Sequence, residues 1–189
     1  MGYGIAESAV RRRHKVTLIS GPTAIIPPKV DKFIRIETAD DLLRELKREI
    51  KKVDCLIMCA AVGDFRPSSV AKRKIRRKTN LLVKLVPNKD LLKELGRYKK
   101  SKLFIGFSLE TENFTKNAVQ KLKTKNLDLI ISNRLTKKHN PFGDNKLEVN
   151  IIDKKGHSLY INNKSKAYIS NVLLDKIERL WYLERKDIL

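Results

Sequence analysis

Cysteine and histidine are scarce in this sequence, which limits the metal sites it can encode. The 189 residues include 2 cysteines and 3 histidines. Both cysteines, Cys55 and Cys59, fall in the apolar run 54–61, where an extended backbone places them on one face. The histidines are scattered along the chain: His14, His139 and His157. We therefore interpret the thiols as small buried hydrophobic side chains rather than as metal ligands or disulfide partners.

Long hydrophobic runs are also lacking. No stretch approaches the roughly 18 apolar residues of a membrane span, and Met1 is not followed by the basic and then apolar pattern of a secretory signal. We expect a cytoplasmic protein without a membrane partner. A length of 189 residues with 41% hydrophobic residues suits one compact core, so we expect residues 1–189 to form a single domain.

Negative charge is the scarcer sign: 21 Asp and Glu residues stand against 42 Lys and Arg residues, giving a net charge of +21. Such a surface attracts phosphates of any kind, and the basic runs Arg11–Lys15 and Lys72–Lys78 raise the hypothesis of nucleic-acid binding. However, the basic residues are spread over the whole chain, and aromatic residues make up only 6% of it. Without a recognition module or interleaved aromatic side chains, we disfavour a nucleic-acid partner.

Short apolar segments alternate with amphipathic ones. The apolar segments are β-branched and bounded by turn residues, as strands buried on both faces are: 15–21, 54–61, 102–108 and 127–133. Between them Thr38 opens a helix whose apolar stripe includes Leu42, Leu46 and Ile50, and further helices are predicted from near Asn88 and over 112–125. This alternation predicts an α/β domain with a Rossmann-like parallel sheet flanked by helices.

Two segments depart from the alternation. Residues 62–80 are polar and basic without a clear period, and they follow the carboxyl end of a predicted strand, where open α/β sheets bind ligands. Residues 146–161 read as a β-hairpin around Asp153–Gly156, followed by an amphipathic helix over 165–181.

Residues around the polar segment carry motifs of a known family. Ala60–Pro67 and Lys74–Arg77 resemble the strand-to-flap region of the phosphopantothenoylcysteine synthetases. Further stretches match that family in the same order and at similar spacing: Leu85–Leu92, Ile105–Thr111, Gln120–Asn126, Asp128–Asn133, Phe142–Asn145 and Lys164–Lys166. No single string is highly specific, but their common order covers nearly the whole chain.

The resemblance implies a ligase of coenzyme A biosynthesis. Such enzymes condense phosphopantothenate with cysteine. Bacterial members use CTP to form an acyl-cytidylate, release pyrophosphate, and then release CMP. The resemblance also implies Mg²⁺ accompanying CTP, a homodimer and, in many bacteria, a flavin-dependent decarboxylase domain upstream in the same polypeptide.

Individual roles also follow from the resemblance. Lys74 matches the essential flap lysine, which is implied to act at the reacting phosphate and to shield the intermediate from water. Asp64 is implied to meet the triphosphate through Mg²⁺. Lys121 and Lys125, which share one face of a helix, match a nucleotide-binding pair. The other implied nucleotide contacts are Ala60, Lys89, Asp90, Leu91, Leu92 and Phe107.

Each role has an alternative that needs no ligand. Lys74 could be a solvated member of a basic run, Lys121 and Lys125 an exposed helix face, and Asp64 a turn residue. Phe107 could serve core packing as well as nucleotide contact. Lys89 stands where the family has proline, so we expect the local turn to differ there.

The beginning of the sequence also departs from the family. Residues 2–10 read as a helix that leads into the strand at 15–21, but no strand precedes that helix, so a βαβ unit lacks its first half. Family members carry here a strand and a glycine-rich turn. We therefore expect a domain incomplete at its N-terminus, poorly stable and inactive or weakly active unless an upstream segment completes it. The alternatives are a non-catalytic fragment of this family or, less favoured, a basic nucleic-acid-binding protein.

Overall fold

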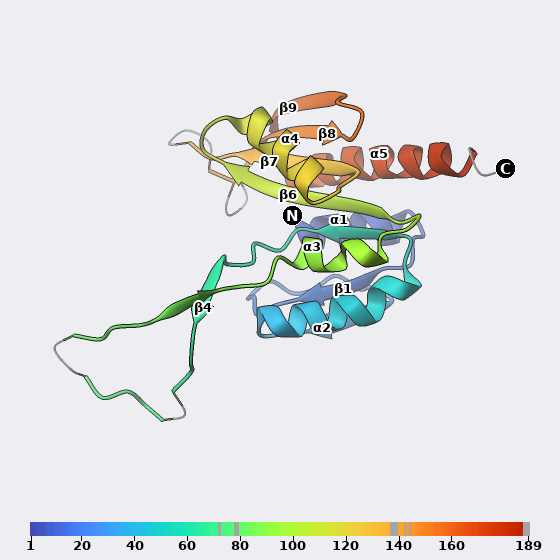
Figure 1. Ribbon diagram of the computed structural model, residues 1–189. Helices are drawn as coiled ribbons and strands as arrows, with labels where there is room; N and C mark the ends of the chain where they lie inside the picture. The colour runs from blue at the N-terminus through green and yellow to red at the C-terminus, as the bar shows by residue number, and fades with distance from the viewer. Residues whose placement is uncertain (72, 78–79, 137–139, 142, 144, 187–189) are drawn as a thin grey trace.

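The computed structural model describes residues 1–71, 73–77, 80–136, 140–141, 143 and 145–186. Several residues singled out above lie outside these ranges: Lys72, Lys78, His139, Phe142 and Asp144. The longer elements follow one another along the chain as shown in Figure 1: α1 (Gly2–Arg11), β1 (Thr17–Ser20), β2 (Lys32–Arg35), α2 (Ala39–Glu49), β3 (Cys55–Met58), β4 (Phe65–Pro67), β5 (Leu85–Pro87), α3 (Leu91–Leu95), β6 (Leu103–Glu110), α4 (Phe114–Thr124), β7 (Leu129–Arg134), β8 (Leu147–Asp153), β9 (Ser158–Lys164) and α5 (Lys166–Lys186).

A five-stranded sheet in the order β3-β6-β7-β8-β9 forms the centre of the protein. β3, β6 and β7 are parallel, and β8 and β9 add antiparallel at one side. The predicted hairpin is confirmed: its turn closes with a hydrogen bond from Gly156 N to Asp153 O, and Gly156 has a φ of +89°, which favours glycine. The predicted α/β class is therefore confirmed, with a sheet that is parallel on one side and antiparallel on the other.

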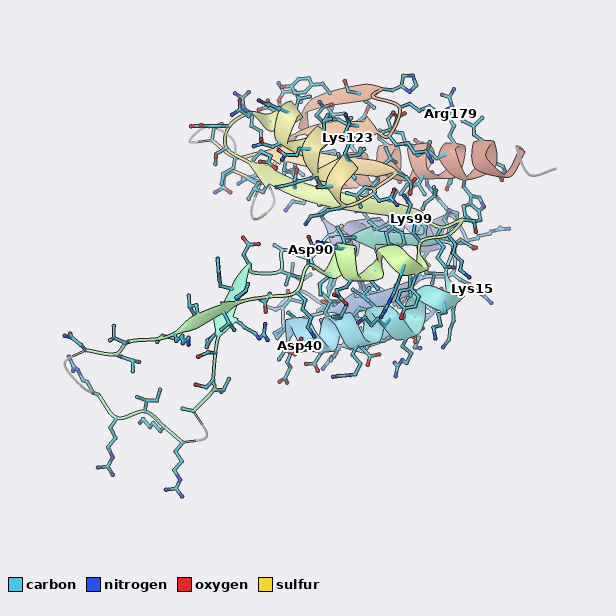
Figure 2. All side chains as sticks on the ribbon, in the orientation of Figure 1. Lys15, Asp40, Asp90, Lys99, Lys123 and Arg179 are labelled. Carbon is cyan, nitrogen blue, oxygen red and sulfur yellow. The ribbon has the colours of Figure 1, made fainter. Side chains whose placement is uncertain are left out.

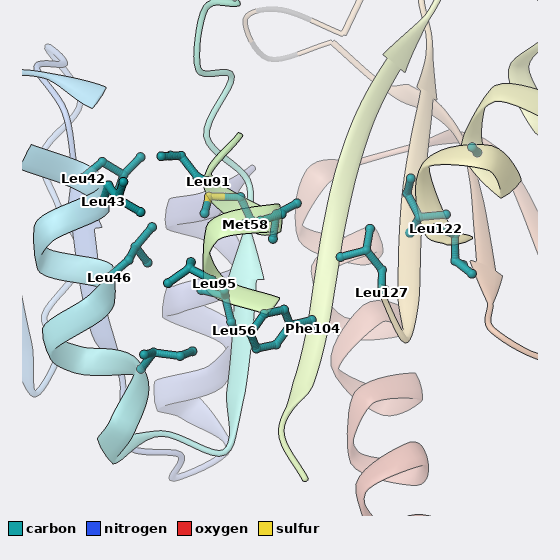
Figure 3. Packing of buried hydrophobic residues seen from close by; sticks show 14 of the residues in the cluster. Leu42, Leu43, Leu46, Leu56, Met58, Leu91, Leu95, Phe104, Leu122 and Leu127 are labelled. Carbon is teal, nitrogen blue, oxygen red and sulfur yellow. The ribbon is translucent and has the colours of Figure 1, made fainter. Parts of the chain in front are cut away.

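Helices cover both faces of the sheet, as the sequence predicts. On one face α2, α3 and α4 pack against β3, β6 and β7, with Leu46, Leu95 and Phe104 among the buried side chains (Figure 3). On the other face α1 and α5 pack against β6, β7 and β8 through residues such as Ile5, Ile131 and Leu173. Because strand residues point alternately to the two faces, Phe104 joins the first cluster while Leu103 and Ile105 join the second.

The parallel strands do not form one continuous sheet. β1 pairs with β2 in a separate two-stranded parallel sheet, and in the described part of the chain neither strand pairs with β3. The interruption falls between β1 and β3. Side chains still connect the two sheets, since Ile19 of β1 packs against the cluster formed by α2, α3 and β3.

An arm extends away from the body of the protein between β3 and α3 (Figure 1). At its base β4 pairs antiparallel with β5, and Ser68 N donates to Lys84 O. The sequence predicts a loop over 62–80 but not this two-stranded base, because β4 and β5 hold only three residues each. Apolar side chains on the arm are exposed, and the Leu82 side chain is 98% exposed.

The predicted helix start at Thr38 is confirmed. The Thr38 hydroxyl accepts a hydrogen bond from Asp41 N at 3.0 Å, and the Asp41 carboxylate accepts one from Thr38 N at 3.1 Å. This reciprocal capping box satisfies amide groups that the first turn of α2 leaves free.

The two thiols are unlinked, and burial raises the pKa of Cys55 and of Cys59 to about 12. This agrees with the interpretation of both as small hydrophobic side chains. None of the helices in the described ranges is long and apolar enough to cross a membrane.

Candidate functional site

The carboxyl ends of the parallel strands β3 and β6 carry the predicted site residues. The chain leaving β3 is fixed by Asn88, whose backbone N donates to Asp64 O and whose side-chain Nδ2 donates to Gly63 O, both at 2.7 Å. Arg66 Nη1 in turn donates to Asn88 Oδ1 at 3.1 Å. These contacts hold the backbone at Asp64 against the start of the α3 segment.

The Asp64 side chain is exposed, and within the described ranges its carboxylate has no hydrogen bond or salt bridge. Ala60 is exposed beside it in the chain. No group of three or more His, Cys, Asp or Glu residues gathers into a metal site among the described residues. A lone exposed carboxylate still fits Mg²⁺, which keeps several waters and needs few protein ligands when it also binds phosphate oxygens.

At the start of α3 Asp90 acts as the N-cap residue, and its carboxylate accepts a hydrogen bond from Lys93 N at 3.2 Å. Lys89 is exposed, whereas the side chains of Leu91 and Leu92 are buried in the core. Because these side chains are buried, a ligand at this position can contact the two leucines only through their backbone groups. α3 is short, at five residues, and its cap is already occupied by a carboxylate.

Lys121 on α4 reaches the end of β6. Its Nζ lies 2.7 Å from Oε1 of Glu110, whose Oε2 accepts a hydrogen bond from Asn117 Nδ2 at 3.0 Å. Burial would raise the pKa of Glu110, but the hydrogen bonds from Lys121 and Asn117 outweigh it, so the pKa lies below its ordinary value. Glu110 is therefore charged at neutral pH and holds Lys121 at the carboxyl end of β6.

Lys125, the residue that ends α4, makes a different ion pair. Its Nζ lies 3.4 Å from Oδ2 of Asp90, which Figure 2 shows at the start of α3. The two lysines predicted to share one helix face thus contact separate carboxylates, and together they connect α4 to β6 and to α3. The side chains of Lys121 and Lys125 are 43% and 34% exposed, so an incoming phosphate can reach them.

Phe107 and Lys74 lie apart from this group. Phe107 is half-buried on β6 and packs against the cluster under α1 and α5, which supports its core-packing interpretation without excluding contact through its exposed part. Lys74 is exposed on the arm, and the described residues offer its side chain no contact. The structure therefore pairs Lys125 with Asp90 and ties the backbone of Asp64 to Asn88, two residues before Asp90, whereas Lys121 pairs with Glu110 and Lys74 lies on the arm.

Sequence reasoning assigned no role to Glu110, Asn117 or Asn88. Glu110 could have been noticed, because a carboxylate that directly ends an apolar strand is costly to bury without a partner. The contacts of Asn88 and Asn117 join segments far apart in the sequence, so no local signal reveals them.

Comparisons with known proteins cover nearly the whole chain. Residues 1–180 match the family described as DNA/pantothenate metabolism flavoprotein C-terminal domain. The coenzyme A biosynthesis bifunctional protein CoaBC of Bacillus subtilis is 36% identical over 182 residues, covering 95% of this chain and 45% of that protein. The protein of the same name from Borreliella burgdorferi is 37% identical over 159 residues, covering 82% of this chain and 40% of its own. The chain spans about half the length of the curated relatives it matches.

Solved structures show the same fold. The C-terminal domain of CoaBC superimposes with a TM-score of 0.79 at 31% identity, covering 94% of this chain and 80% of that one. The H337A mutant of Cab2, solved as a complex with phosphopantothenate-cysteine, has a TM-score of 0.63 at 24% identity, covering 82% of this chain and 55% of its own.

Proposed function

Because the chain belongs to the DNA/pantothenate metabolism flavoprotein C-terminal domain family, we propose that it is the ligase that joins phosphopantothenate to cysteine in coenzyme A biosynthesis. The observation that carries the proposal is the pair Lys121 and Lys125, of which Lys121 lies beside the carboxyl end of β6 and Lys125 beside the start of α3, both with partly exposed side chains. Two cations placed near the carboxyl end of a parallel strand and the start of a helix suit the phosphates of a nucleotide.

The nucleotide we propose is CTP. In the first step, a carboxylate oxygen of phosphopantothenate attacks the α-phosphorus of CTP. The new P–O bond gives an acyl-cytidylate while the bond to pyrophosphate breaks. In the second step, the amine of cysteine attacks the acyl carbon and loses a proton, and the C–O bond to CMP breaks. Lys121 and Lys125 would hold the negative charge that moves between the phosphates.

Asp64 would hold Mg²⁺ together with phosphate oxygens, and the ion would supply further charge neutralisation. Lys74 would approach the reacting phosphate when the arm moves, since its position on an exposed extension leaves it free to do so. Ala60, Lys89, Phe107 and the backbone at Asp90–Leu92 would line the nucleotide.

The assembly is also part of the proposal. The bifunctional relatives are about twice as long as the matched region, which supports association with a flavin-dependent decarboxylase domain. From the family resemblance we further propose a homodimer that works in the cytoplasm.

Thermal unfolding in the presence of CTP and Mg²⁺ tests the nucleotide site even if turnover is slow. We expect CTP to raise the midpoint temperature of unfolding of the wild-type chain. A Lys121→Gln/Lys125→Gln variant should lose that increase. A folded wild-type chain that CTP does not stabilise would contradict the proposal.

Pyrophosphate release with phosphopantothenate and cysteine then separates an active ligase from a family member that binds without turnover. Salt-sensitive DNA binding without stabilisation by CTP would favour the nucleic-acid alternative.

A further inference from the structure

A cavity of about 610 Å³ lies near the amino ends of β3 and β6, whereas the candidate site lies toward the carboxyl ends of these strands. It opens between the segments that precede β3 and β6, two neighbouring parallel strands. Figure 2 shows Asp90 and Lys99 near opposite ends of the segment that begins with α3. The cavity lies at the end of this segment that carries Lys99. Its lining consists of Lys51, Arg97, Tyr98, Lys100 and Lys102.

Four of these five side chains are cations, and the lining contains no carboxylate. Within the described ranges no salt bridge involves Lys51, Arg97, Lys100 or Lys102. Cations elsewhere in the chain do have carboxylate partners, as Arg12 does with Asp175 at 2.7 Å. The cavity is therefore a local concentration of uncompensated positive charge.

Carboxylates on neighbouring segments are either engaged by other cations or outside the lining. Glu49 binds Lys32 at 2.7 Å and also contacts Arg48. Asp128 is buried between Lys99 at 3.0 Å and Lys154 at 3.3 Å. Asp54 follows the η1 segment, but it does not line the cavity.

Two of the cations are held in place by their surroundings. Lys102 Nζ donates to Val53 O at 2.6 Å, and the guanidinium of Arg97 lies 5.0 Å from the centroid of the Tyr98 ring. Tyr98 itself packs partly against the core cluster under α2 and α3. Donors positioned before binding lose less conformational entropy when a ligand arrives.

We propose that this cavity binds a small molecule that carries two or more linked phosphates, at a site separate from the candidate nucleotide site. A guanidinium and three ammonium groups match several phosphate oxygens at once, and the volume is in the range of ligand pockets. The inference rests on the lining residues alone and does not depend on the proposed ligase activity.

Calorimetric titration with inorganic tripolyphosphate at physiological ionic strength tests the site. The titration uses the full chain carrying Lys121→Gln/Lys125→Gln, so that the candidate nucleotide site contributes little. Adding Arg97→Gln/Lys100→Gln is expected to weaken binding by about tenfold or more, because two charge-assisted contacts are lost. Lys51→Gln, placed on the other side of the cavity, is expected to weaken it by a smaller factor.

The matched control removes the same charge elsewhere, with Lys29→Gln/Lys146→Gln at two exposed lysines. We expect this control to change the affinity less than about twofold, since screened distant charges contribute little. Equal losses in the control and in the Arg97→Gln/Lys100→Gln chain would overturn the proposal in favour of general attraction by net charge. It would also fall if the cavity variant lost binding to single-stranded DNA and kept its affinity for tripolyphosphate.

Discussion

The ammonium group of Lys121 lies 2.7 Å from Oε1 of Glu110, and this contact fixes α4 to the last residue of β6. A buried carboxylate therefore sets the position of a cation that we assign to the nucleotide. Replacing the carboxylate changes both the stability of the protein and the position of the lysine.

Glu110→Gln is expected to lower the free energy of unfolding at neutral pH by about 1 kcal/mol, a modest value because Lys121 is partly screened by solvent. The pKa of Glu110 is lowered in the folded state, so its stabilisation is complete above the unfolded pKa of about 4.3 and is lost as the pH falls through the folded pKa. Urea unfolding of both proteins at several pH values measures this. A stability difference that stays constant into the acid range would argue against the ion pair.

Asp90→Asn is expected to tighten CTP binding by about twofold to fivefold, because it removes the charge that competes for Lys125. Asparagine caps helices about as well as aspartate does, so the stability should change little. Titration of both proteins with CTP, together with thermal unfolding, measures the two effects. Weaker CTP binding by the variant would mean that Asp90 itself serves the ligand.

Lys74→Ala is expected to reduce the rate of pyrophosphate release by about 100-fold or more, while stabilisation by CTP is largely kept. Stabilisation by CTP should remain because Lys74 lies on the arm, away from Lys121 and Lys125. Arg73→Ala, one residue earlier on the same arm, is the matched control and should retain most of the activity. Similar losses in both variants would indicate that only the overall charge of the arm matters.

Gly106→Ala is expected to destabilise the protein by about 1–3 kcal/mol. A Cβ at this position would lie 2.5 Å from Cδ1 of Leu127, which is buried in the core cluster on the sheet face covered by α2, α3 and α4. Denaturant unfolding measures the loss. Gly96→Ala is the control, because a Cβ there meets nothing within 4 Å. A stable Gly106→Ala variant would show that Leu127 can shift at little cost.

The fold could be predicted from the sequence where one local signal dominated. Buried strands such as β6 and β7 are continuous apolar runs, and the helix beginning after Thr38 has both a cap and an apolar stripe. β2 was not predicted, because Lys32–Arg35 holds only two apolar residues between two charged ones. β4 and β5 were also missed, since their pairing depends on residues about 20 positions apart in the chain.

The candidate site was predictable as a set of residues but not as a set of contacts. Family motifs indicated Asp64, Lys121 and Lys125, whereas the carboxylate partners of the two lysines are chosen by packing between distant segments. The pairing of Lys125 with Asp90 depends on how α3 and α4 lie beside β6, and no spacing in the sequence reports that.

The interruption between β1 and β3 affects how the protein opens locally. Backbone hydrogen bonds bind β3 and β6–β9 into one ladder, so these strands should exchange their amide hydrogens only in a common opening. In the described chain β1 and β2 share ladder hydrogen bonds only with each other, and side-chain contacts hold them to the rest: Ile19 packs on the core cluster, Ser20 bonds Tyr3 and Lys32 pairs with Glu49. Their amides should exchange with solvent well before those of β6 and β7, which makes β1–β2 a separate unit of local unfolding.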